Sequence, residues 1–336
     1  MPYTVEIPDF GSLSTEQRRA VDHAGSIRLK GGPGTGKSLV SLWRALNSSA
    51  GESVLVLTYT LSLEFYFKEM LKRAAEKGFK KNVKVQRSQK SFYNQNSMLA
   101  GRWDELVLDE AQDMTEEQLR LFKQKAGRIS YGADYKQQLY PDQAASQDDL
   151  EEILTVTREF TLRRTYRSTR QILLAVRAFF PDRGLSADAL QLARPGQPVK
   201  FAFADRYDVF DKTKEILRKT LEENSGNVAV LVPSESKVDD MIDEVKQVLP
   251  SDTTYYRSGK GVDRIDEMGR VHVCTYKSSK GLEWDVVILP FWGGRDWFMD
   301  NTRVGENDHY VAMTRGKGQL WIISDDEYDE TILSNG

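Results

Sequence analysis

Short apolar runs alternate with amphipathic stretches along the whole chain. In the first half, runs rich in aliphatic and β-branched residues predict strands, and stretches with an apolar residue every three or four positions predict helices. The predicted strands are 27–30, 53–59, 105–109 and 128–134, and the predicted helices are 15–24, 37–47, 62–77 and 115–125.

The second half has the same style. Its predicted strands are 228–232, 271–276, 285–289 and 319–323, and its predicted helices lie near 168–180, 207–223 and 235–248. The Pro/Gly-rich stretch RPGQP at 194–198 predicts a loop between elements. Continuous apolar strands separated by helices indicate parallel sheets covered on both faces. We therefore predict an α/β chain with two domains, 1–160 and 161–336.

Length and composition agree with two globular domains. The chain has 336 residues, of which 40% are hydrophobic and 29% charged. No apolar run approaches the roughly 18 residues that cross a bilayer, and the start MPYTVEIPDF lacks the features of a secretory signal. We therefore expect a cytoplasmic protein with no membrane partner. The single cysteine, Cys274, excludes an internal disulfide and, with only three histidines, disfavours a zinc site.

Charge is unevenly distributed along the sequence. The net charge is only −3, but the segment 64–90 carries nine lysines and arginines against three glutamates. Such a basic segment fits a track for a polyanion, and it fits a solvated helix face equally well. Charge alone leaves both interpretations open.

The stretch GGPGTGKS at 31–38 fits the phosphate-loop pattern G-x-x-x-x-G-K-[ST] and lies between a predicted strand and a predicted helix. Backbone N–H groups and the helix N-terminus then face a phosphate. Lys37 supplies charge for the β- and γ-phosphates, and Ser38 supplies a hydroxyl for Mg²⁺. The pattern predicts an ATP or GTP site whose loop residues contact the nucleotide: Gly32, Pro33, Gly34, Thr35 and Gly36.

Two adjacent carboxylates, Asp109 and Glu110, end the apolar run LVLD. The carboxyl ends of strands are where α/β sheets bind ligands. The pair divides naturally into a ligand for Mg²⁺, Asp109, and a base that takes a proton from water, Glu110. Together with the phosphate loop, this pair indicates a nucleotide-hydrolysing enzyme.

The stretch LVLDEAQD at 106–113, following the phosphate loop, resembles the core of superfamily 1 helicases, and specifically their UvrD/Rep branch. Six further motifs occur in the order of that branch: LSTEQRRAV (13–21), LTYTLSL (57–63), GADYKQQLY (132–140), FTLRRTYRS (160–168), TYKSSKGLEWD (275–285) and YVAMTRG (310–316). The resemblance therefore covers residues 13–323. It implies two tandem RecA-like P-loop NTPase domains with parallel sheets and an ATP cleft between them.

The resemblance assigns roles around ATP. In the first domain it implies that Gln17 reads the adenine and that Gln137 couples the phosphate state to DNA. From the second domain, Arg167 and Arg315 would act as arginine fingers on the γ-phosphate when the cleft closes. Tyr166 would stack on the adenine, and Glu283 would lie near the ribose and γ-phosphate.

The resemblance also implies contacts with single-stranded DNA by Thr58, Tyr59, Tyr140, Thr275 and Lys277. Lys277 replaces the family's histidine, and Thr165 replaces the asparagine of N-Y-R-S. The family's base-packing tryptophan is missing after Tyr140. Trp292 and Trp297 are candidates to supply that stacking group, and packing within the protein is an equally open role for them.

The accessory domains of the UvrD/Rep branch are reduced in this chain. The spans that hold them in the family are here Leu63–Leu106 and Thr169–Thr275. We expect the first accessory domain to be reduced to the basic segment at most, and the second to be missing.

These features predict an ATP- and Mg²⁺-dependent translocase or helicase that moves 3′→5′ on single-stranded or partially duplex DNA. An alternative is a nucleotide-gated DNA-binding switch in a defence or repair complex, with a nuclease partner performing the chemistry. RNA as the track is a second alternative, although no reader of a 2′-hydroxyl is identifiable in the sequence to support it.

Overall fold

The computed structural model describes residues 8–49, 51–79, 82–94, 99–183, 185, 187–257, 260–262, 264, 267–293 and 304–326. They form two compact units, one within Val5–Arg163 and the other within Arg164–Gly336. We call them the first and the second unit and describe each separately.

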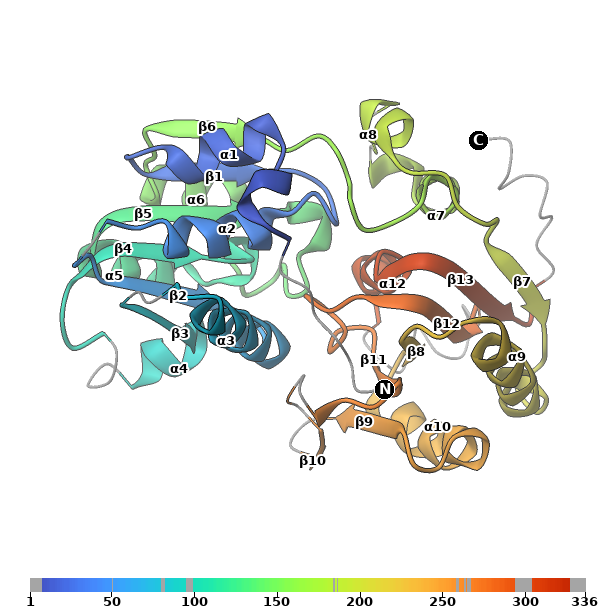
Figure 1. Ribbon diagram of the computed structural model, residues 1–336. Helices are drawn as coiled ribbons and strands as arrows, with labels where there is room; N and C mark the ends of the chain where they lie inside the picture. The colour runs from blue at the N-terminus through green and yellow to red at the C-terminus, as the bar shows by residue number, and fades with distance from the viewer. Residues whose placement is uncertain are drawn as a thin grey trace. The chain divides into compact units, whose positions relative to one another are not determined.

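The first unit is built on a six-stranded, entirely parallel sheet with the order β3-β2-β4-β5-β1-β6 (Figure 1). Its strands are β1 (Ile27–Lys30), β2 (Val54–Thr58), β3 (Val83–Arg87), β4 (Trp103–Leu108), β5 (Ala126–Ala133) and β6 (Arg158–Thr161). The residues of β2 are all buried, as expected for a central strand of a covered parallel sheet.

Helices cover both faces of this sheet (Figure 1). One face carries α1 (Thr15–Asp22), α2 (Lys37–Leu46) and α3 (Leu61–Glu76), and the other carries α5 (Glu116–Lys125) and α6 (Gln147–Ile153). The short helix α4 (Ser88–Tyr93) follows β3. The core on the α5 and α6 side is formed by strand residues such as Leu106 and Ile129 packed with Phe122 and Leu150.

The second unit has a seven-stranded sheet with the order β10-β9-β11-β8-β12-β13-β7. All its neighbours pair in parallel except β10, which is antiparallel to β9 at one edge. Its strands are β7 (Lys200–Phe203), β8 (Val228–Val232), β9 (Thr253–Arg257), β10 (Lys260–Gly261), β11 (Val271–Thr275), β12 (Trp284–Trp292) and β13 (Gly316–Ser324).

This sheet is also covered on both faces (Figure 1). Helices α9 (Val209–Glu223) and α10 (Glu235–Val248) pack on one face, while α7 (Arg170–Phe179) and α12 (Glu306–Met313) pack on the other. The helix α8 (Ala187–Leu192) packs on α7. Residues 194–198 form no helix or strand, as predicted.

The predicted α/β class with two RecA-like parallel sheets is confirmed, with the antiparallel strand β10 as an addition. The eight predicted strands are the central four of each sheet. Five strands were not predicted, namely β3, β6, β7, β9 and β10, and all of them lie at or beside a sheet edge. Edge strands are short and partly polar because only a central strand has both neighbours and both faces covered.

The basic segment does not form a separate accessory element. Its described residues build α3, β3 and the start of α4, which belong to the first unit's own α/β layers. The segment therefore supplies elements of the first unit's own sheet and helix layers. Among the described residues, no helix combines the length and apolar character needed to cross a bilayer.

Candidate functional site

The phosphate loop connects β1 to α2, and its glycines have conformations that other residues avoid. Gly34 and Gly36 have φ of 68° and 88°. A Cβ on Gly36 would lie 2.5 Å from Nε2 of Gln17. The Thr35 hydroxyl donates to the Gly32 carbonyl at 2.9 Å and fixes the turn. Glycine is therefore required at Gly36 by both backbone conformation and space.

Lys37, the first residue of α2, is buried against this loop. Its Nζ donates to the carbonyls of Gly31 at 2.7 Å and Gly32 at 3.1 Å, and lies 3.9 Å from Oδ2 of Asp134. The ammonium charge therefore lies within the loop at a helix N-terminus, where an anionic phosphate is stabilised.

Ser38 and Asp109 are 71 positions apart in sequence and meet at the end of the sheet. The Ser38 hydroxyl donates to Oδ2 of Asp109 at 2.8 Å, and Asp109 is buried directly after β4. Mg²⁺ in nucleotide sites is usually held by one or two protein oxygens together with phosphates and water. The paired hydroxyl and carboxylate oxygens beside the loop fit that requirement.

Glu110 has a left-handed backbone, with φ of 57°. Its Oε2 accepts a hydrogen bond from the amide of Gln112, and the Gln112 oxygen accepts the backbone N–H of Asp134 at 3.0 Å. Oδ2 of Asp134 in turn accepts from Nε2 of Gln137 at 2.6 Å. The structure thus connects the predicted base to Gln137 through Gln112. Our sequence analysis missed Gln112, although its place two residues after Glu110 was a usable signal.

Gln17, the predicted adenine reader, lies against the phosphate loop. Its Oε1 accepts the backbone N–H of Ser14 in a capping box at the start of α1, and its Nε2 donates to the Thr35 carbonyl at 3.1 Å. The side chain is buried, and its amide oxygen and amide nitrogen both form hydrogen bonds within the protein. The side chain thereby joins α1 to the phosphate loop.

The aromatic DNA-contact candidates of the first unit lie together. Tyr59 follows β2 and Tyr140 follows the 3₁₀ turn Tyr135–Gln137, and their ring centroids are 6.0 Å apart. Burial raises the pKa of Tyr59 well above its usual value, and the nearby Asp113 adds to the rise. Thr58 is fully buried at the end of β2. The two rings therefore form a partly exposed aromatic pair, whereas the Thr58 side chain is buried and donates to the Thr60 carbonyl at 3.4 Å.

In the second unit, three motifs distant in sequence converge. Nε of Arg167 donates to Oε2 of Glu283 at 2.8 Å. Arg315 is 2% exposed and donates to the carbonyls of Val311 at 2.9 Å and Leu282 at 3.4 Å, and to the Thr314 hydroxyl at 3.0 Å.

Glu283 lies within the positive field of this group. Burial alone would raise the pKa of the Glu283 carboxyl, but Arg167, Lys317 and Arg315 outweigh it and lower the pKa. The predicted nucleotide-facing residues of this unit therefore form one charged cluster with a stably ionised carboxylate at its centre.

The remaining predicted residues of the second unit lie nearby along the chain. Tyr166 is 43% exposed, with the Arg164 guanidinium 5.2 Å from its ring centroid. The hydroxyl of Thr275, at the end of β11, donates to the Ser278 hydroxyl at 2.9 Å and accepts the Ser278 backbone N–H at 3.1 Å. Nζ of Lys277 lies 3.8 Å from Oδ2 of Asp308, a carboxyl whose pKa is raised by burial against the opposing effect of Lys277.

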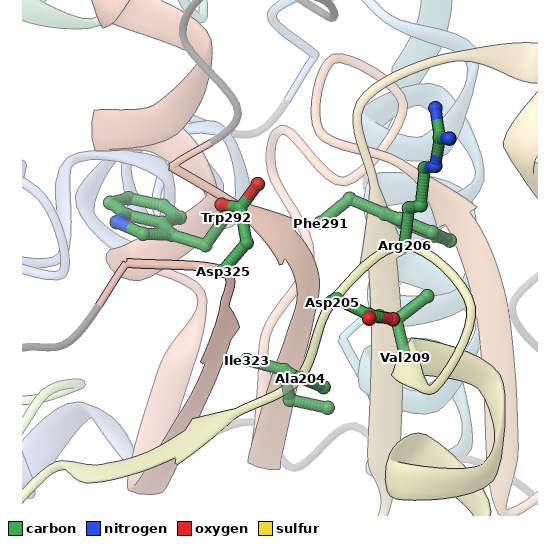
Figure 2. A pocket seen from close by; sticks show the side chains of 8 residues that line it. All are labelled: Ala204, Asp205, Arg206, Val209, Phe291, Trp292, Ile323 and Asp325. Atoms are coloured by element: carbon green, nitrogen blue, oxygen red, sulfur yellow. The ribbon is translucent and has the colours of Figure 1, made fainter.

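Trp292 differs from its predicted role. It lines a small open pocket at the carboxyl ends of β7, β12 and β13, together with Phe291 and Asp325 (Figure 2). The indole is only 4% exposed and packs on Phe179 and His309. Stacking on a base requires an accessible ring face, so Trp292 is a packing residue. Trp297 lies outside the described residues.

The basic segment is partly neutralised by its own glutamates. Lys68 pairs with Glu64 at 2.5 Å, and Arg73 pairs with Glu69 at 2.8 Å, both one turn apart on α3. Such pairs are typical of a solvated helix face. This favours the solvated-face interpretation for that part of the segment, and Lys80 and Lys81 lie outside the described residues.

The sequence of residues 27–304 matches the family model of the Schlafen group 3 DNA/RNA helicase domain. The chain belongs to this helicase-domain family. The helicase identification made from the motifs is thereby confirmed, whereas the family description does not specify the UvrD/Rep branch. No curated protein matches the chain in sequence.

Three solved helicase structures match the structure of this chain. Arterivirus nonstructural protein 10 is 16% identical, with a TM-score of 0.48 over 95% of this chain and 63% of that one. The PRRSV helicase is 16% identical, with a TM-score of 0.49 over 92% and 54%. The structure of the arterivirus protein in complex with DNA is 16% identical, with a TM-score of 0.47 over 95% of this chain and 65% of that one. This chain thus spans less than two thirds of each of them.

Proposed function

We propose that this helicase domain is an ATP-driven motor that moves along single-stranded DNA in the 3′→5′ direction, as the UvrD/Rep type does. The observation that carries the proposal is the direct contact of Ser38 with Asp109 beside the buried Lys37. In support of the proposal, the loop at 31–38, the Ser38 and Asp109 oxygens and Glu110 all lie at one end of the same sheet.

In the first unit, the backbone N–H groups of Gly32 to Gly36 and the charge of Lys37 hold the phosphates of ATP. Ser38 and Asp109 would hold Mg²⁺, which would neutralise phosphate charge when bound. Glu110 accepts a proton from the attacking water. Gln137 changes its partner when a γ-phosphate is present, and thereby links the nucleotide to the nucleic acid.

In the second unit, Arg167 and Arg315 supply positive charge to the γ-phosphate in the transition state, with Glu283 holding Arg167 in place. Tyr166 offers an exposed ring for the adenine. Alternate gripping of the strand by the two units then converts each hydrolysis cycle into a step.

The proposed DNA contacts are the pair Tyr59 and Tyr140, next to the buried Thr58 at the end of β2, and Thr275 and Lys277 of the second unit. Aromatic rings hold single-stranded bases without sequence preference, as a translocating motor requires. Trp292 is not among the proposed contacts because its ring is buried.

The test is ATP turnover by the purified chain with and without single-stranded DNA, and with RNA as the second polymer. We expect DNA to stimulate turnover. Glu110→Gln should bind ATP normally but hydrolyse it about 10²–10⁴ times more slowly, because it loses the base and keeps the pocket. Lys37→Ala should weaken binding and turnover together. Glu117→Gln on the exposed side of α5 is the matched control and should behave like the parent.

The outcomes separate the candidate functions. Parental turnover by Glu110→Gln would refute the assigned chemistry. If RNA stimulates ATP turnover and DNA does not, the nucleic acid along which the motor moves is RNA and not DNA. Slow turnover that no nucleic acid stimulates would favour the nucleotide-gated switch with a nuclease partner. Partial duplexes with a 3′ or a 5′ tail then determine the direction of movement.

A further inference from the structure

The side chain of Gln112 bridges the ends of two neighbouring strands. Its amide nitrogen donates to the carboxylate of Glu110, after β4, and its amide oxygen accepts the backbone N–H of Asp134, after β5, at 3.0 Å. Gln112 is fully buried in the 3₁₀ turn Ala111–Asp113, so water does not replace either bond. Its backbone carbonyl also accepts from Nε2 of Gln138 at 2.7 Å.

The chemistry of the two partners fixes the orientation of the amide. A carboxylate only accepts and a backbone N–H only donates, so a flipped amide would face both partners with the wrong atom. A glutamate at this position would keep the bond to Asp134 and lose the bond to Glu110. A leucine would lose both bonds at nearly the same volume.

The backbone conformation of Glu110 has to be stabilised by neighbouring groups. Its φ of 57° is unusual for a residue other than glycine, and such a conformation persists only where the surroundings hold it. The Gln112 amide is a buried group that contacts its carboxylate directly.

We infer that Gln112 is a positioning residue for ATP hydrolysis: its amide holds the Glu110 carboxylate in place and ties it to Asp134. The inference rests on the proposed function, in which Glu110 is the base. Asp134 bonds Gln137 at 2.6 Å and lies 3.9 Å from Nζ of Lys37. The bridge therefore connects the base with the residues that contact the phosphates.

The experiment compares kcat and KM for ATP in the parent, Gln112→Glu and Gln112→Leu, at saturating DNA. The matched control is Gln118→Glu, which also adds one carboxylate at a buried glutamine. Gln118 accepts a capping bond from the Thr115 backbone, and glutamate accepts the same bond.

In Gln112→Glu the bond to Asp134 remains, but a carboxylate oxygen replaces the N–H that Glu110 accepts. We expect kcat to fall about tenfold to a hundredfold, with KM for ATP nearly unchanged, because the base loses its support while the phosphate loop stays intact. Gln112→Leu should lower kcat at least as much, because it loses both bonds. Gln118→Glu should keep the parental kcat. A parental kcat in Gln112→Glu, or a loss that Gln118→Glu shares, overturns the inference.

A second measurement does not depend on activity. Gln112→Glu should lower the Tm, because two buried acceptors then face each other with no donor between them. Adding Glu110→Gln exchanges the donor and acceptor, restores one bond, and should recover most of that loss. A double variant as unstable as Gln112→Glu overturns the bridge. If the parent hydrolyses no ATP, the proposed function fails, and this cycle still decides whether Gln112 holds Glu110.

Discussion

Arg315→Lys is the substitution that tests the proposed use of the second unit most directly. In the proposal, the guanidinium of Arg315 stabilises charge that develops on the γ-phosphate. Alanine is a poor choice of replacement, because Arg315 is 2% exposed and its three donor contacts include the buried Leu282 carbonyl. Removing the whole side chain would leave a cavity and buried acceptors, and would unfold the unit locally. Lysine keeps the charge and the stem and loses the planar fork.

The two consequences have different sizes. Lysine can replace at most part of three hydrogen bonds, so we expect a stability loss of about 1–3 kcal/mol, at about 1 kcal/mol for each lost bond. For a unit of this size that lowers Tm by about 2–4 °C per kcal/mol. An arginine finger is worth about 10³–10⁵ in rate, and lysine retains only its charge, so turnover should fall at least about a hundredfold.

The assay is DNA-stimulated ATP turnover well below the Tm, with ATP affinity measured in parallel. The control is Arg270→Lys, since Arg270 also bonds backbone carbonyls in the second unit, at Leu221 and Gly226. We expect Arg270→Lys to lose stability but keep turnover. Arg315→Lys should keep ATP affinity and DNA binding but lose the stimulation by DNA. If it hydrolyses ATP at the parental stimulated rate, Arg315 is a structural arginine and the two-unit motor is refuted.

Two further predictions concern the DNA contact and the buried histidine. Tyr59→Leu and Tyr140→Leu should each weaken single-stranded DNA binding by about 1–3 kcal/mol, measured by titration, while turnover without DNA stays unchanged. The control Tyr207→Leu removes an exposed ring between Asp205 and Asp208 and should have no effect, whereas equal losses in all three variants would refute the assigned aromatic pair. Burial lowers the pKa of His272 to about 3, compared with about 6.5 in the unfolded chain. Only the unfolded state gains a proton between these values, so acidification from about pH 6.5 toward pH 3 should destabilise the second unit by up to about 1.4 kcal/mol per pH unit. His272→Asn should remove that part of the acid dependence of Tm, and an unchanged dependence would contradict it.

The central strands and the chemistry at their ends were predictable from sequence. A strand such as β2 is apolar throughout because it has neighbours on both sides and helices on both faces. The phosphate loop and the pair Asp109–Glu110 were predictable because their spacing is local, within one strand–loop–helix unit or directly after one strand. Each of these patterns consists of residues that are neighbours in the sequence.

The edge strands were not predictable in this way, because β6 (REFT) and β3 (VKVQR) lack a continuous apolar run. Their strand character comes from pairing with β1 and β2, which the sequence does not display. The same limit applies to Trp292, whose burial against Phe179 follows from the packing of α7 on the sheet.

The precise site was decided by tertiary structure. Gln112 reaches Asp134 only because β4 and β5 pair in parallel, with Leu108 opposite Tyr131, so that both strands end at one edge. Arg167 reaches Glu283 across 116 positions of sequence. The order of the motifs was enough to identify most of these residues. Whether two of them form a hydrogen bond depends on ångström-scale distances between parts of the chain that are far apart in sequence. Those distances are fixed by strand register and helix packing, which no local pattern encodes.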